Sequence, residues 1–558
     1  MTDLWIPNPN DENAILKFLD AIDGEAESTR KNYDKNWDEN INQVRGNQWR
    51  LRRSPYFLAN IIRNQVRRKI AHLTESKAQI QVRSVKADLS KASNVLYNTC
   101  RSILDSGSLE NVLYRVALYG MTVGCSFVGS PYDAEKDDVD LSFIDPRRVY
   151  IDRHTTSSYE LHKSQYIRID TVLPLSEIRM RFPGRGALVK PDDKHSSYFD
   201  SPRSKLSIVA SVLQALPKVY RPGTPSKSGP IPWAEARGYW IRDPQLGLDG
   251  NVMFPGGRHI IRAGDIILKD EANPYWDGLP PIDMFEWDVD FDSPWGADEV
   301  QDLRRIQEAV NRLGDAWVKN TLLGSNFKII ADLDALDPEQ WEKIDNEAGL
   351  VIRKKPNREI RYESPVPDQG TMPTTIESLI RLCDLLTGIG ESSRSPAQGA
   401  AALEGLQMAR HVLTRVIARR LESLLERIGQ KLISRVFQFY NSDRVLFQQG
   451  PTREWIAYTY ERQKLLEDDN GKLRPVSEIQ KRYRDFKFLV TPGSSLASSR
   501  IQRTMAMMQF RQATGIVPSL RRILQEADLG DPDTLIAESL EEAKVLPPPP
   551  DTRKRPGR

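Results

Sequence analysis

The sequence has few cysteines and no long apolar run, and each shortage excludes a class of protein. Only three cysteines occur in 558 residues: Cys100, Cys125 and Cys383. Because they are odd in number and far apart, we expect neither a disulfide framework nor a cysteine-rich zinc site, and we expect a reducing compartment. No apolar stretch approaches the ~20 residues of a membrane span, and the N-terminus carries acids where a signal peptide carries bases. We therefore expect a cytosolic product without membrane contact.

An excess of one charge is also missing. The chain has 79 basic and 76 acidic residues, a net charge of +3. A protein that grips nucleic acid over its whole surface would be far more basic, so any such contact must be local or loose. The composition, 39% hydrophobic and 28% charged, is typical of globular proteins, and the length predicts two to four domains.

Motifs for nucleotide binding and for catalysis are absent as well. Gly471-Lys472 cannot belong to a phosphate-binding loop of the Walker type, because Leu466 stands where the upstream glycine is required. The chain has no HExxH and no GxSxG, and its six histidines are scattered. We therefore predict no catalytic residue, no metal site and no cofactor, and we expect that the protein is not an enzyme.

One acidic cluster leaves an alternative open. Asp288, Asp290 and Asp292 alternate in the sequence, and in a strand this spacing would place all three carboxylates on one face. A metal-dependent nuclease centre is therefore conceivable. No basic or histidine partner accompanies the three acids, which favours a solvated loop instead. A cytosolic scaffold or adaptor protein, which would form a small oligomer without a channel, is the other alternative.

Apolar periodicity predicts the main helices. Residues 11–37 are expected to form a polar helix, and 297–323 an amphipathic one, with Asp298 in the first turn where the helix dipole favours acids. A further helix is expected where TTIESLIRLCDLLTGI carries Ile376, Leu379, Ile380, Cys383 and Leu386 on one side. The longest pattern, 403–440, would span roughly 57 Å. Short strands with glycine-rich turns are expected between a short helix at 206–220 and the helix at 297–323.

Several phrases occur in an order that resembles the portal proteins of tailed bacteriophages, from roughly Gln43 to Ala543. They are NQW, DPRRVYID, FPGGR, NPYWDGLPP, PWGADEV and Thr387-Gly388-Ile389. The resemblance implies an α+β portal fold with wing, helical stem, small β-rich clip, long tunnel helix and C-terminal helical crown. The expected segments are an N-terminal wing at 1–200, a first stem helix at 201–225, the clip module at 226–296, a second stem helix at 297–325, a continuation of the wing at 326–390, a tunnel loop at 391–402, the long tunnel helix at 403–440, a β-rich connection between wing and crown at 441–493, the crown at 494–545 and a disordered, proline-rich basic tail at 546–558.

The resemblance also implies a function. Portal proteins form a ring, usually of twelve subunits, at one capsid vertex in the virion, after assembly in the host cytoplasm. Double-stranded DNA passes through the channel during packaging and ejection. The implied partners are further copies of the chain, the terminase large subunit, head-completion or tail adaptor proteins, and the major capsid and scaffolding proteins.

The tunnel loop is the implied place of DNA contact. Because a conduit must contact DNA without holding it, small and polar residues with few bases should line the constriction. By position we expect Ser392, Ser393, Arg394 and Gln398 beside the DNA. Three further arginines on the following helix are expected to face the channel or a neighbouring subunit: Arg410, Arg415 and Arg419.

Overall fold

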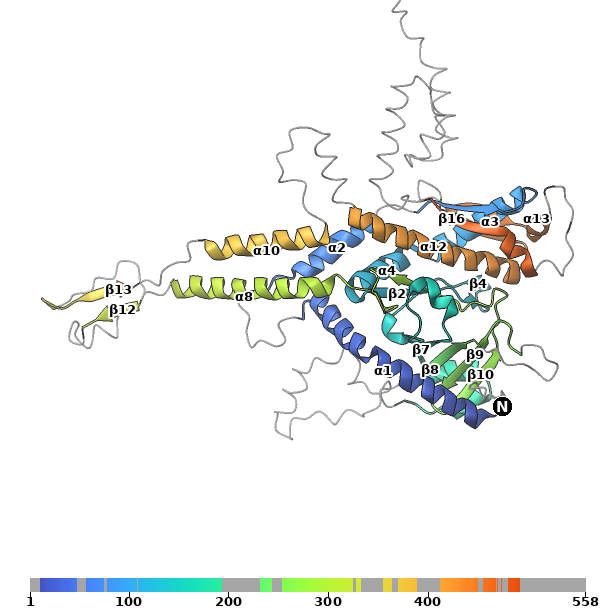
Figure 1. Ribbon diagram of the computed structural model, residues 1–558, viewed down its shortest axis with the longest axis horizontal. Coiled ribbons are helices and arrows are strands. Elements are labelled where there is room, and N and C mark those ends of the chain that lie inside the picture. The colour runs from blue at the N-terminus through green and yellow to red at the C-terminus, as the bar shows by residue number, and fades with distance from the viewer. Residues whose placement is uncertain are drawn as a thin grey trace, which may run out of the picture. The chain divides into compact units, whose positions relative to one another are not determined.

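We describe the fold from a computed structural model of the chain. The structure describes residues 11–47, 57–74, 78–107, 109–192, 231–242, 253–324, 328–332, 355–363, 370–388, 412–449, 455–467, 469, 473 and 480–491. The fold contains both helices and antiparallel sheets (Figure 1), which confirms the predicted α+β class. The predicted first stem helix at 201–225, the tunnel loop, the crown and the tail lie outside the described residues and stay predictions.

The chain divides into two compact units. Unit 1 comprises Met1–Trp37, Ile70–Asp298 and Leu413–Arg558, and unit 2 comprises Asp38–Lys69 and Glu299–Val412. Two helices cross from one unit into the other: α1 (Glu12–Arg45) and α2 (Ile61–Leu73). We describe each unit by itself.

The largest sheet of unit 1 has five antiparallel strands in the order β10-β9-β8-β7-β6 (Figure 1). β8 pairs with β7 along all nine of its residues, from Ile241 opposite Tyr166 to Trp233 opposite Pro174. The strands expected between 226 and 296 therefore exist, but they do not form a clip module of their own, because they continue a sheet that begins in the predicted wing. The strands are β6 (Val149–Ile151), β7 (Tyr166–Pro174), β8 (Trp233–Ile241), β9 (Arg258–Ala263) and β10 (Ile266–Ala272).

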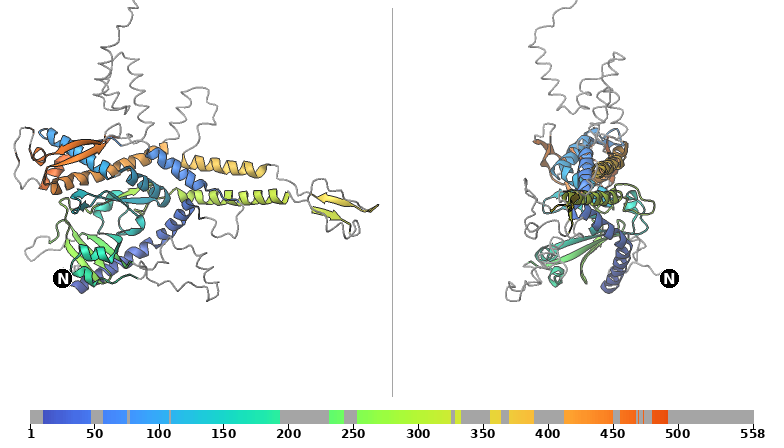
Figure 2. Two further views of the ribbon diagram at one scale, coloured as in Figure 1. Left: turned by 180° about the vertical axis from the view of Figure 1, so that it is seen from behind. Right: turned by 90° about the vertical axis from the view of Figure 1, so that its left-hand side faces the viewer.

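Both faces of this sheet are covered. Strand residues of opposite parity point to opposite faces. One set, including Tyr239 and Ile260, packs under α1 through Leu19 and Ile22, and Figure 2 shows α1 running beside the sheet. The opposite set, including Ala234, packs in a second cluster with residues of the short helices that follow β7. These are α5 (Leu175–Arg181) and η4 (Arg185–Leu188).

A second sheet of unit 1 has three antiparallel strands in the order β11-β2-β5, and every residue of β2 and β11 is buried. β11 is an edge strand whose outer backbone carbonyls need partners. The long helix supplies them: Lys431 Nζ donates to the carbonyls of Pro280 (2.9 Å) and Ile282 (2.8 Å), and Arg427 donates to that of Met284. The elements are β2 (Cys125–Gly129), β5 (Ser142–Ile144), β11 (Ile282–Glu286), α4 (Leu109–Val123) and α12 (Val412–Phe439).

The rest of unit 1 consists of two-stranded sheets and short helices. β1 pairs with β16, β14 with β15, and β3 with β4, each antiparallel. The described residues between 441 and 491 thus include the strands β14, β15 and β16. These elements are β1 (Ile80–Ser84), α3 (Ser90–Ser106), β3 (Tyr132–Asp133), β4 (Asp138–Val139), η2 (Pro146–Arg148), η3 (Ser158–Lys163), β14 (Arg444–Gln449), β15 (Trp455–Tyr460), α13 (Arg462–Leu466), η7 (Tyr483–Asp485) and β16 (Phe486–Val490).

Unit 2 contains two longer helices with a strand pair between them in the sequence. α8 (Val300–Gly324) is the helix predicted at 297–323, and α10 (Thr371–Thr387) is the helix predicted around Ile376. The two helices pack side by side (Figure 1). β12 (Lys328–Ala331) pairs antiparallel with β13 (Ile360–Glu363), so the order along the chain is helix, strand pair, helix.

Candidate subunit interface

The middle of α8 carries a row of polar side chains that form hydrogen bonds with the segment before α2 and the start of α2. Gln307, Asn311 and Asp315 follow each other at intervals of four residues and so share one face of the helix. Asp315 Oδ1 accepts the backbone N–H of Phe57 at 2.8 Å, and Asn311 Oδ1 accepts that of Ala59 at 3.3 Å. The remaining member of the row, Gln307, accepts the first N–H groups of α2, at 2.8 Å and 3.2 Å, and thereby caps that helix. The row therefore holds the segment before α2 against α8.

The C-terminal part of α10 is held by α2. Gln65 and Arg68 of α2 both donate to the carboxylate of Asp384, and the Thr387 hydroxyl donates to Gln65 Oε1 at 3.3 Å. Gly388, in the left-handed conformation with φ +70°, ends α10. Because Asp384 lies on the face that meets α2, the orientation of α10 in unit 2 is fixed.

This orientation leaves a leucine face exposed on α10. Leu382, Leu385 and Leu386 are 40%, 74% and 50% exposed, and their spacing of three and four residues places them on one side of the helix. On α8, Trp317 and Leu322 are 38% and 51% exposed. We call the three leucines of α10 the apolar stem surface. In the described part of the chain these side chains stay 40–74% exposed. Exposed apolar side chains gathered on one face are typical of protein–protein contact sites.

The apolar stem surface was missed in the sequence. The helix expected around Ile376 was assigned one apolar side that included Leu386, whereas the structure places Leu386 among the exposed residues. The sequence did contain an indication of this exposed face. LIRLCDLL carries apolar residues around most of the helix, and such a helix needs a second partner in addition to the one in its own unit.

The structure describes only two of the predicted channel residues, Arg415 and Arg419. Ser392, Ser393, Arg394, Gln398 and Arg410 lie outside the described residues. Two further predicted residues belong to α12: Arg415 is half-buried and Arg419 is exposed. Their proximity to DNA therefore stays a prediction.

The long helix α12 is anchored by buried cationic side chains. Lys431 is buried and forms an ion pair with Asp283 at 3.0 Å, in addition to its bonds to the carbonyls of Pro280 and of Ile282 in β11. Burial lowers the pKa of Lys431, and Asp283 opposes this shift. One turn further along, Arg435 pairs with Asp277 and lies over the ring of Tyr275 at 3.6 Å. These contacts fix the C-terminal half of α12.

The acidic cluster at 288–292 does not have the predicted geometry. β11 ends at Glu286, so the alternation expected of a strand does not extend over the three acids. Asp288 pairs with Arg420 at 3.0 Å, and Asp290 accepts the N–H of Phe291 at 2.8 Å, as residues of a solvated loop do. Within the described residues, no group of three or more His, Cys, Asp or Glu side chains is placed to hold a metal ion.

An ion network joins α1 to the five-stranded sheet. The buried carboxylate of Asp23 accepts hydrogen bonds from Arg168 (2.8 Å), Arg237 (2.6 Å), Arg262 and the Tyr239 hydroxyl (2.9 Å). Burial raises the pKa of Tyr239, and the Asp23 charge raises it further. The network therefore fixes α1 on the sheet.

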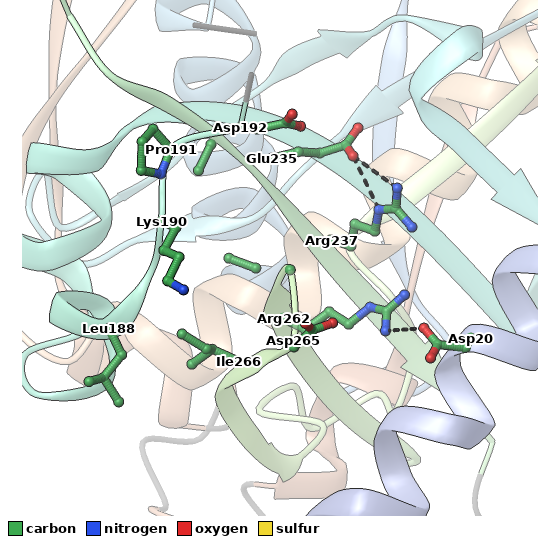
Figure 3. A pocket seen from close by; sticks show the side chains of 13 residues that line it. Asp20, Leu188, Lys190, Pro191, Asp192, Glu235, Arg237, Arg262, Asp265 and Ile266 are labelled. Carbon is green, nitrogen blue, oxygen red and sulfur yellow. Dashed lines mark hydrogen bonds and ion pairs between the residues drawn. The ribbon is translucent and has the colours of Figure 1, made fainter. Parts of the chain in front are cut away.

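A pocket of about 540 Å³ lies beside this network (Figure 3). Its arginines are already paired with carboxylates of the same chain: Arg237 with Glu235 at 3.0 Å and Arg262 with Asp20 at 2.7 Å. Figure 3 shows both pairs on the pocket wall. Because charges of both signs neutralise each other there, the lining favours no ligand charge, and the pocket does not resemble a catalytic or cofactor site.

The three cysteines are free and buried. Burial raises the pKa of the Cys100 thiol to about 12 and that of Cys383 to about 11, and it also raises the pKa of Cys125. Thiols in such surroundings are poor nucleophiles, because the thiolate is the reactive form. No helix in the described part of the chain combines the length and the apolar character that a bilayer crossing requires.

Comparison with known proteins gives weak similarity only. No protein-family model matches the chain, and no curated protein matches it significantly. Among solved structures, a chain from the virion of a native gene transfer agent particle is similar, with a TM-score of 0.39, 10% identity and coverage of 83% of this chain and 89% of that chain. A chain from the neck of an empty gene transfer agent particle, determined with C6 symmetry, has a TM-score of 0.40 and 10% identity, with coverage of 84% and 89%.

Proposed function

We propose that this protein is a portal subunit, which assembles into a ring with a central channel for double-stranded DNA during packaging and ejection. The observation that carries the proposal is the exposed apolar stem surface on α10, a helix that packs beside α8 and is joined to it through a strand pair. A chain that forms a closed ring needs such a surface on every copy, because each subunit meets two neighbours. The ordered phrases of the sequence that resemble portal proteins support the same function.

The proposal assigns the stem and the clip to new segments. α8 and α10 are the two stem helices, and the region between them, which contains β12 and β13, is the clip. The expected positions at 201–225 and 226–296 are replaced, because β8, β9 and β10 belong to the wing sheet. The tunnel loop at 391–402 then follows the second stem helix and precedes α12, the tunnel helix.

The charge distribution suits a conduit. Each phosphate that a cation neutralises releases counterions, so many contacts would hold the duplex and stop its movement. The net charge of +3 and the few basic residues expected near the tunnel loop keep such contacts scarce. Ser392, Ser393, Arg394 and Gln398 are the residues that we place beside the DNA.

The remaining roles belong to the same proposal. The ring, of about twelve subunits by family analogy, occupies one capsid vertex of the virion. The terminase large subunit and later the head-completion or tail adaptor proteins dock on the clip. Major capsid and scaffolding proteins surround the wing.

Negative-stain electron microscopy of the purified protein tests the proposal. We expect end-on views of rings with a central hole wide enough for a duplex. Monomers or dimers without a hole, at every protein concentration tried, would contradict it. A cation-dependent cleavage of plasmid DNA by the same preparation would favour the nuclease alternative.

A further inference from the structure

The hairpin of β14 and β15 exposes one apolar face. Residues opposite each other in an antiparallel pair lie on the same face, and the face alternates along each strand. The pairing sets Phe447 opposite Ala457 and Gln449 opposite Trp455. Val445, Phe447 and Trp455 therefore share one face, and they are 57%, 53% and 56% exposed. We call these three residues the outer hairpin face.

The other face of the hairpin packs into unit 1. Tyr460 is fully buried, and its hydroxyl donates to the Tyr440 carbonyl at 3.1 Å. Tyr458 forms a hydrogen bond with the side chain of Asn98 in α3. A two-stranded hairpin is marginally stable by itself and depends on the packing of its apolar side chains. The outer hairpin face is therefore a surface that a further segment can cover with a gain in stability.

The described chain ends in the same part of unit 1. Its last strand, β16, pairs with β1, and α3 packs against both β1 and β14. The N–H of Thr491, directly after β16, donates to the Gln79 carbonyl at 2.9 Å. Residues 492–501 reach roughly 33 Å when extended, which exceeds the length of α3, about 26 Å for its 17 residues. The segment that begins at Ile501 can therefore reach the outer hairpin face.

The sequence of this segment has the apolar character that the face selects. Residues 501–510 read IQRTMAMMQF, belong to the predicted crown and lie outside the described residues. Ile501, Met505 and Met508 follow each other at intervals of four and three residues, so a helix would carry all three on one side. Methionine side chains are flexible and polarisable, and they pack well against aromatic rings such as those of Phe447 and Trp455.

We propose that the outer hairpin face is the docking surface for residues 501–510 of the same chain. A tethered segment has an effective concentration on the order of millimolar, so it occupies this face ahead of a free protein of similar apolar character. The contact places the start of the predicted crown on the hairpin of unit 1. It does not depend on the proposed ring, because both sides of the contact belong to one copy.

Methionine oxidation of the full-length chain tests the contact, since hydrogen peroxide converts accessible methionines to the sulfoxide and peptide mass spectrometry reads each one separately. Met180, 67% exposed, is the exposed reference, and Met284, fully buried, is the buried reference for an intact fold. We expect Met505 and Met508 to oxidise at least about tenfold more slowly than Met180, because covering the exposed halves of three large apolar side chains favours the docked state by more than that factor. Rates equal to that of Met180 would overturn the inference.

A double substitution shows whether the hairpin provides the protection. Phe447→Lys with Trp455→Lys places two charges on the outer hairpin face. Leu188→Lys with Ile231→Lys is the matched control, at side chains that are 65% and 50% exposed elsewhere in unit 1. We expect the two methionines of the segment to reach the rate of the exposed reference in the first variant only, with the buried reference protected in both. Protection that persists in the first variant would assign the segment to another surface and overturn the inference.

A substitution on the segment and a dilution series complete the test. Ile501→Lys leaves every described residue unchanged and should release Met505 and Met508 in the same way, which keeps the test valid if the double substitution unfolds the hairpin. Protection within one chain does not depend on concentration, so protection that disappears on dilution would assign the face to a neighbouring copy and overturn the inference. A chain that stays monomeric with both methionines protected would support the inference and contradict only the portal.

Discussion

The apolar stem surface makes a quantitative prediction about assembly. Leu385→Ser and Leu386→Ser, introduced together, remove two side chains that are 74% and 50% exposed. Full burial of a leucine contributes about 1.5–3 kcal/mol, so covering these exposed fractions contributes roughly 2–4 kcal/mol per interface. The double variant should therefore weaken subunit association by about one and a half to three orders of magnitude. Its folding should change little, because at least half of each side chain faces solvent in the isolated subunit.

Mass photometry over a dilution series measures the association, and thermal unfolding checks the fold. Met180→Ser with Leu188→Ser is the matched control, since these side chains are 67% and 65% exposed but belong to unit 1. The control should assemble like the unchanged protein. If the two leucine substitutions on α10 leave association unchanged while both variants fold, α10 is not the subunit contact and the assignment of the stem is wrong.

Three further predictions concern the stability of the fold. Gly314→Ala should destabilise unit 2, because an added Cβ would lie 2.0 Å from the Phe57 ring; we expect a loss of about 1–3 kcal/mol in urea unfolding, and Gly314→Ser should lose at least as much. Burial lowers the pKa of His259 from 6.5 to about 4, so its neutral form stabilises the fold fully above pH 6.5, and up to ~3 kcal/mol is lost as the pH falls from 6.5 towards 4; His259→Gln should flatten that part of the stability curve, and an unchanged curve would contradict the assignment. Lys431→Met leaves the buried Asp283 unpaired and should cost about 3–5 kcal/mol, whereas Lys431→Met combined with Asp283→Asn should recover part of the loss.

Helices were predictable where one apolar stripe decides the structure. The patterns that begin at 297 and around Ile376 are α8 and α10, and the described part of the longest pattern is α12. A stripe is a local property that recurs within a few residues, so it can be read without knowledge of the partner. The polar helix expected at 11–37 is α1, but its buried ion network through Asp23 could not be foreseen, because Arg168, Arg237 and Arg262 come from three separate strands.

Strand pairing and exposure were not predictable in the same way. The short strands expected before the helix at 297–323 exist as β8, β9 and β10, but the identity of their neighbour depends on a pairing with β7 across a long stretch of chain. Sequence order suggested a separate module there, and the sheet topology corrected it. Likewise, the sequence shows that Leu385 and Leu386 are apolar, but it does not show whether they are buried. Only the packing of α10 against α8 and α2 leaves them exposed.

The most direct measurement is a high-resolution electron microscopy structure of the assembled protein. We predict a closed ring with a channel along its axis, with Leu382, Leu385 and Leu386 buried between neighbouring copies and residues 391–402 nearest to the axis. A closed dimer without a channel, or a ring in which these leucines face solvent and 391–402 lies at the periphery, would contradict the proposed portal and its assigned stem.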